Sequence, residues 1–177
     1  MRILIIALPR TGSTSLLEKL SKQYNLKAVF EPFIGASRYA YSDTLKNIVV
    51  KTMMYHLPPN SDNVIDGYIQ LSSKFDEVIL LSRRNLNECS ESWAYLQEHN
   101  QPKMKGGFHS QKHYIWNPPA DDKIQKALDF VVNLHSELEE IGKALNIPIT
   151  YYEDIYDVNS DEKYRKNIKN DIITKII

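Results

Sequence analysis

Arg10 is the first residue of this chain whose type and position point to chemistry. It lies in a short polar segment between a nearly unbroken apolar run, Arg2 to Leu8, and leucines at helical spacing from Leu16 onward. The apolar run is typical of a strand buried on both faces. A strand, a tight loop and a helix in this order direct backbone N–H groups and the helix N-terminus at one point, where an anion binds. The sequence therefore predicts a phosphate or sulfate site formed by Arg10, Thr11, Gly12, Ser13, Thr14 and Ser15.

This loop departs from the nucleotide-hydrolase template GxxxxGK[ST]. When Gly12 is aligned with the second glycine, Ala7 stands at the first glycine and Ser13 at the lysine that reaches the terminal phosphates. Thr14 keeps the hydroxyl that anchors Mg²⁺ in that template. The missing lysine disfavours ATP or GTP hydrolysis, and Arg10 is the cation that the loop offers instead.

Other polar residues lie in or just after the remaining predicted strands, which are Lys27–Phe30, Asn47–Met53 and Glu77–Ser82. Glu31 ends the first of these strands, Lys51 lies within the second, and Arg84 follows the third. Ligands of parallel sheets lie at the carboxyl ends of the strands. We therefore expect Glu31 and Arg84, together with Met53 at the end of the second strand, to share one site with Arg10.

The rest of the chain alternates helices with strands, which predicts an α/β fold, a three-layer sandwich with a central parallel sheet. A weak helix is expected over Gly35–Lys46, and stronger ones over residues 61–75 and 85–98 and after the caps Asp121 and Asp122. Ile147–Tyr152 is expected to be the last strand, and residues 101–119 a long loop. We expect a single domain over residues 1–158, followed by a charged tail over residues 159–177 that is partly disordered.

Composition excludes several classes of function. The 177 residues carry 22 Lys and Arg against 22 Asp and Glu, so no global basic field favours nucleic acid or an anionic membrane. Cys89 is the single cysteine, which excludes an internal disulfide and suits a reducing compartment. No apolar run approaches the length of a membrane span. We expect a cytoplasmic protein, of an oligomeric state that composition leaves open.

Two segments together resemble the sulfotransferases that use 3′-phosphoadenosine 5′-phosphosulfate (PAPS). Pro9-Arg10-Thr11-Gly12-Ser13-Thr14 is similar to their phosphosulfate-binding loop, and Arg84, with Ser92 eight residues later, is similar to their second signature. Tyr152-Glu153-Asp154-Ile155 resembles a Tyr-Glu-Asp-Leu segment of many members. The resemblance spans about residues 2 to 155 and implies a P-loop NTPase-like sulfotransferase fold, as in a small carbohydrate-type or bacterial or viral member.

The resemblance implies PAPS as sulfate donor, PAP as product and no metal. The N–H groups and hydroxyls of Thr11 to Ser15 would hold the 5′-phosphosulfate. Arg10 would offset the charge that builds on the bridging oxygen as the S–O bond breaks. Arg84 and Ser92 would hold the 3′-phosphate.

An acceptor hydroxyl must lose its proton as it attacks sulfur, so a general base is needed. Glu31 is the leading candidate, because Phe30-Glu31-Pro32-Phe33 resembles the Phe-Glu-Pro segment of carbohydrate-type members. His56 is the rival. The cytosolic branch has Lys-Thr-His-Leu-Pro, where this chain has Lys51-Thr52-Met53, with His56-Leu57-Pro58 displaced by three residues. Lys51 would help to hold the sulfuryl group.

Three functions stay open. The first is a sulfotransferase acting on a hydroxyl or amine of a small molecule or saccharide. The second is an ATP-dependent small-molecule kinase of P-loop fold, against which the missing lysine counts. The third is a non-catalytic nucleotide-binding module. His109 and His113 lie in the glycine-containing loop and favour an acceptor-binding loop over a metal site.

Overall fold

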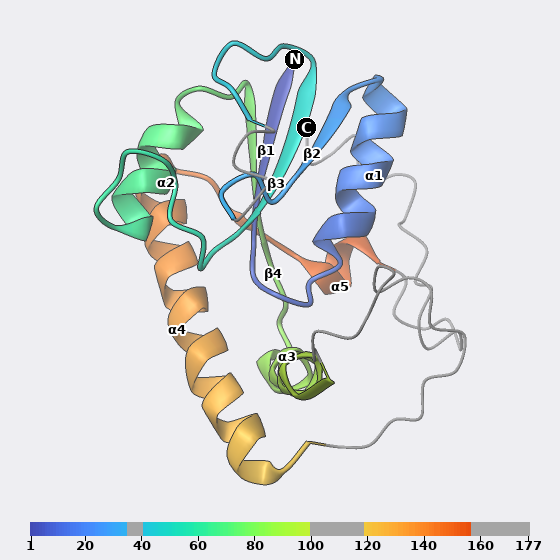
Figure 1. The fold of residues 1–177 in the computed structure, drawn as a ribbon, viewed down its shortest axis with the longest axis vertical. Coiled ribbons are helices and arrows are strands. Elements are labelled where there is room, and N and C mark those ends of the chain that lie inside the picture. Colours follow the sequence, from blue (N-terminus) through green and yellow to red (C-terminus); the bar gives the residue numbers. More distant parts are fainter. Residues whose placement is uncertain (35–40, 100–118, 157–177) are drawn as a thin grey trace.

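A parallel sheet of five strands forms the centre of the molecule (Figure 1). The computed structural model describes residues 1–34, 41–99 and 119–156. The strand order is β2-β3-β1-β4-β5, so the first strand of the chain is central. The strands are β1 (Arg2–Ala7), β2 (Lys27–Phe30), β3 (Ile48–Met53), β4 (Glu77–Ser82) and β5 (Ile149–Tyr151).

Helices cover both faces of this sheet (Figure 1). They are α1 (Ser13–Tyr24), α2 (Val64–Ser72), α3 (Leu86–His99), α4 (Asp121–Leu145) and the short α5 (Tyr152–Ile155). Side chains of β1 alternate between two cores, Leu4 and Ile6 packing with α2 and α4, and Ile3 and Ile5 packing with α1 and α5. Burial on both faces explains why β1 is apolar throughout. The predicted α/β three-layer sandwich with a central parallel sheet is confirmed.

Two predicted strands match the structure in full, namely Lys27–Phe30 and Glu77–Ser82. Helix α1 begins at Ser13, earlier than expected. Ser13, Thr14 and Ser15 therefore form the first turn of the helix, and the loop itself is shorter. Since the N–H groups of a first helical turn lack intrahelical partners, the same residues still present their donors.

The helix predicted over Gly35–Lys46 is wrong for its described part, which is a turn. Leu45 N donates to the carbonyl of Ser42 at 3.0 Å, and the hydroxyls of Ser42 and Thr44 lie 2.9 Å apart. Such local side-chain bonds compete with a helix. Residues 35–40, the predicted loop over 101–118 and the predicted tail lie outside the described residues.

Smaller corrections concern the last helix and strand. The N-cap of α4 is Ala120, and Asp121 and Asp122 lie in the first turn without capping it, where their charges still complement the helix dipole. Strand β5 ends at Tyr151, since Tyr152 already begins α5. Among the described helices, none is long and apolar enough to span a membrane.

Candidate functional site

The loop between β1 and α1 has an unusual backbone conformation. Arg10 and Gly12 have φ values of 62° and 71°, both in the left-handed region, and Thr11 between them is buried with its Oγ1 donating to the carbonyl of Leu8 at 2.8 Å. Gly12 is the N-cap of α1 and supplies no side-chain cap. The first N–H groups of α1 are thus left to an external acceptor, as in an anion site.

Two buried side chains from distant segments hold this loop. The Tyr156 hydroxyl donates to the carbonyl of Gly12 at 2.5 Å, and a Cβ on Gly12 would lie 2.8 Å from the Tyr156 ring. The Cys89 thiol donates to the carbonyl of Pro9 at 2.9 Å. Glycine is therefore required at position 12 by both its φ and its neighbour. Sequence reasoning missed both side chains, although Tyr156 directly follows the Tyr-Glu-Asp-Ile segment.

Arg10 and Ser92 meet in space. Arg10 Nε donates to Ser92 Oγ at 2.7 Å, across 82 residues of sequence. Ser92 lies in α3, and Arg10 in the loop after β1. This bond and the one from Cys89 to Pro9 join the two segments that resemble sulfotransferase signatures.

Glu31 and Lys51 form a buried ion pair next to this loop. The Lys51 side chain is 1% exposed and its Nζ contacts the Glu31 carboxylate, which is 22% exposed. Nζ also lies 4.2 Å from the centroid of the Phe30 ring, a cation–π contact. Burial lowers the pKa of Lys51, the Glu31 carboxylate opposes that shift, and the nearby charge of Arg10 adds to it. Arg10 therefore lies within electrostatic reach of the pair.

The Glu31 carboxylate reaches Lys51 because of the turn at the end of β2. Glu31 has φ 43°, and its N–H still donates to the carbonyl of Lys51 at 2.8 Å. The register pairs Phe30 with Lys51, so the residue after Phe30 falls beside the lysine. Sequence reasoning did not predict this pair, which follows from the register of β2 and β3.

His56 belongs to the same cluster. Its side chain is 3% exposed, and neither ring nitrogen has a hydrogen-bond partner among the described residues. Burial lowers its pKa to about 4, with the charge of Glu31 acting in the opposite direction and that of Lys51 in the same one. The ring packs edge-on against Tyr55, with centroids 4.5 Å apart. At neutral pH the imidazole is uncharged and has a free acceptor nitrogen.

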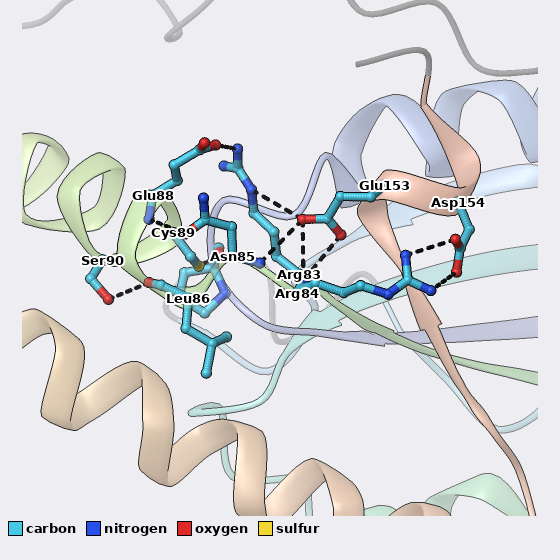
Figure 2. A network of polar contacts seen from close by, with 10 residues as sticks. Arg83, Arg84, Asn85, Leu86, Glu88, Cys89, Ser90, Glu153 and Asp154 are labelled. Atoms are coloured by element: carbon cyan, nitrogen blue, oxygen red, sulfur yellow. Dashed lines mark hydrogen bonds and ion pairs between the residues drawn. The ribbon is translucent and has the colours of Figure 1, made fainter. Parts of the chain in front are cut away.

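Arg84 belongs to a separate network at the start of α3 (Figure 2). Its guanidinium donates two bonds of 2.7 Å to the carboxylate of Asp154. The N–H groups of Arg84 and Asn85 donate to the carboxylate of Glu153 at 3.0 to 3.3 Å. Arg84 thus pairs with an acid of α5, while Ser92, its predicted partner in holding a phosphate, bonds to Arg10.

The structure accordingly forms two polar groups at the carboxyl edge of the sheet. The first holds the predicted residues Arg10, Glu31, Lys51, His56 and Ser92 together with the loop. The second holds Arg84 with the acids of α5, which sequence reasoning left without a role. His109 and His113 lie outside the described residues, within which no three His, Cys, Asp or Glu side chains are grouped to hold a metal ion.

Comparison with known proteins gives distant likenesses among solved structures alone. No protein-family model matches this chain, and no curated protein matches it. Among solved structures, the 1.7 Å crystal structure of shikimate kinase from Bacteroides thetaiotaomicron is similar, with 10% identity and a TM-score of 0.42. The match covers 83% of this chain and 99% of the kinase chain. A likeness of this degree assigns no activity.

Proposed function

We propose that this protein transfers the sulfuryl group of PAPS to a hydroxyl or amine of a small-molecule or saccharide acceptor. The observation that carries the proposal is the 2.7 Å hydrogen bond from Arg10 to Ser92. The resemblance relates both segments to PAPS. It assigns the 5′-phosphosulfate to the loop after β1 and the 3′-phosphate to Arg84 and Ser92. Because the donor carries its 5′-phosphosulfate and its 3′-phosphate on one ribose, the two segments that hold these groups must lie side by side.

The loop residues would hold the 5′-phosphosulfate. The uncapped N-terminus of α1 and the left-handed turn at Gly12 provide backbone donors. The Arg10 cation would stabilise the negative charge that develops on the bridging phosphate oxygen as the S–O bond breaks. Arg84 and Ser92 would hold the 3′-phosphate by charge-assisted hydrogen bonds.

In the reaction, the acceptor oxygen forms a bond to sulfur while the bond from sulfur to the 5′-phosphate oxygen breaks. The acceptor proton goes to a base, and PAP leaves with the electron pair. Glu31 is favoured as this base, because its side chain is partly exposed whereas His56 is buried. Lys51, whose ammonium group pairs with the Glu31 carboxylate, would stabilise the negative charge on the sulfuryl group during transfer.

Phosphorylation of a small molecule by ATP is the second candidate. Thr14, in the first turn of α1, is the observation that favours it, because a hydroxyl at this position anchors Mg²⁺ in P-loop enzymes. The loop supplies no lysine at Ser13, which counts against it. The distant likeness to shikimate kinase favours neither PAPS nor ATP as the donor.

Calorimetry with PAP, PAPS and ATP with Mg²⁺ separates these candidates. We expect PAP and PAPS to bind without metal and Arg10→Met to abolish binding, while Lys22→Met, on the last turn of α1, leaves it unchanged. Tight ATP binding without PAP binding would overturn the proposal.

Labelled PAPS with a panel of acceptors then tests turnover. Glu31→Gln is expected to abolish transfer while PAP still binds. If both Glu31→Gln and His56→Ala keep full transfer, neither residue is the base. PAP binding with no transfer to any acceptor would favour the non-catalytic module.

A further inference from the structure

The guanidinium of Arg84 is already paired with an anion of the protein itself (Figure 2). Both terminal nitrogens donate to the two carboxylate oxygens of Asp154 at 2.7 Å. This fork-to-fork arrangement is also the one by which arginine holds a phosphate. The same two donors therefore serve either the carboxylate or a phosphate.

Glu153 and Asp154 are adjacent but differ in what they hold. Glu153 accepts from the backbone N–H groups of Arg84 and Asn85, directly before α3, and so anchors α5 to the start of that helix. Asp154 contacts the Arg84 side chain, and both side chains are about half exposed, at 50% and 52%. Because both side chains are half exposed, water can solvate each of them when they separate, and the exchange leaves no unpaired charge buried.

The Arg84 side chain has a second support that would persist during such an exchange. The guanidinium carbon lies 4.5 Å from the centroid of the Tyr151 ring. A guanidinium resting on an aromatic face keeps its plane while its in-plane donors change partner. The Tyr151 ring therefore supports the Arg84 guanidinium whether its partner is the Asp154 carboxylate or a phosphate.

We propose that Asp154 sets the donor affinity of this site by competing with the 3′-phosphate of the donor for the Arg84 guanidinium. The inference rests on the proposed function. On donor binding Arg84 exchanges the carboxylate for the phosphate, and Asp154 turns to solvent. No covalent bond changes. Because Asp154 returns when the nucleotide leaves, PAP is held more weakly than by an unpaired arginine and is released faster.

The test measures binding of PAP and of AMP, which lacks the 3′-phosphate, by calorimetry. Removing the competing charge by Asp154→Asn is expected to tighten PAP binding about five-fold. AMP binding is expected to stay unchanged. Asp122→Asn, which removes the same charge from an exposed pair with Lys126 on α4, should change neither affinity.

The sign of the effect distinguishes competition from a structural role. If Asp154 served only to hold α5, Asp154→Asn would weaken PAP binding and lower the melting temperature. In the double variant Arg84→Ala with Asp154→Asn, the gain should vanish. Asp154→Ala provides a second variant with the same expected gain.

If the wild type binds PAP and both Asp154 variants bind it equally well or more weakly, the competition between Asp154 and the 3′-phosphate is refuted. The proposed function is then unaffected. Absence of PAP binding by every variant and by the wild type, with ATP bound, overturns the proposed function as well.

Discussion

Removing the Glu31 charge should destabilise the fold through Lys51. In Glu31→Gln the Lys51 ammonium, 1% exposed, loses its carboxylate partner and keeps its contact with the Phe30 ring. The lysine then stays charged and desolvated or loses its proton. From its ordinary pKa of 10.5, losing the proton at pH 7 costs about 5 kcal/mol, which is an upper limit. Since Glu31 is partly exposed and the ring remains, we expect a loss of about 3 kcal/mol.

The assay is urea unfolding followed by circular dichroism at pH 7 and pH 9.5. Burial holds the Lys51 pKa below its unfolded value, and more so without Glu31. Between the folded and unfolded pKa the unfolded state binds more protons, so the free energy of unfolding of the variant rises with pH. The deficit relative to the wild type should therefore shrink at pH 9.5.

Two controls isolate the pair. Glu98→Gln removes a carboxylate from the surface pair with Lys123, which is 49% exposed, and should lower the free energy of unfolding much less than Glu31→Gln does. The double variant Glu31→Gln with Lys51→Met should recover most of the stability, because an apolar side chain replaces the buried charge. If Glu31→Gln costs no more than Glu98→Gln, the buried pair does not support the fold and the reasoning is refuted.

Two further predictions concern His56 and Gly12. Because burial lowers the pKa of His56 to about 4 from its ordinary value, the unfolded state binds more protons between pH 6.5 and pH 4. The free energy of unfolding should therefore decrease as the pH is lowered through this window, by up to about 3 kcal/mol. The same titration of His56→Phe should be flatter over this window, and equal slopes for the two proteins would contradict the burial of a neutral imidazole. Gly12→Ala forces a Cβ into the left-handed region and 2.8 Å from the Tyr156 ring, so the free energy of unfolding should drop by about 1 to 3 kcal/mol. A melting temperature equal to that of the wild type in scanning calorimetry would show that the loop has another conformation.

The elements of the sheet could be predicted from the sequence because burial on two faces leaves a strong pattern. The apolar run after Arg2 and the run Glu77–Ser82 are both strands of the structure. The helix expected before Asn47 fails in its described part because short side-chain bonds, such as that between Ser42 and Thr44, decide a local conformation that periodicity does not detect.

The site was predictable as a set of residues, but its pairings were not. The contact between Glu31 and Lys51 depends on the register of β2 and β3 and on a left-handed φ at Glu31. Hydrophobic periodicity encodes neither of these. The partner of Arg84 is 70 residues away in α5. A lysine in a strand is equally compatible with a snorkelling side chain, so its burial became evident only in the folded structure.

The contact between Tyr156 and Gly12 also orders events during synthesis. The hydroxyl and the carbonyl that it binds are 144 residues apart, so the loop near the start of the chain lacks this support until position 156 has left the ribosome. Strand β1, by contrast, finds its neighbours β3 and β4 much sooner. A nascent chain can therefore assemble the middle of its sheet while the loop between β1 and α1 is still open, and this loop takes its final form among the last parts of the fold.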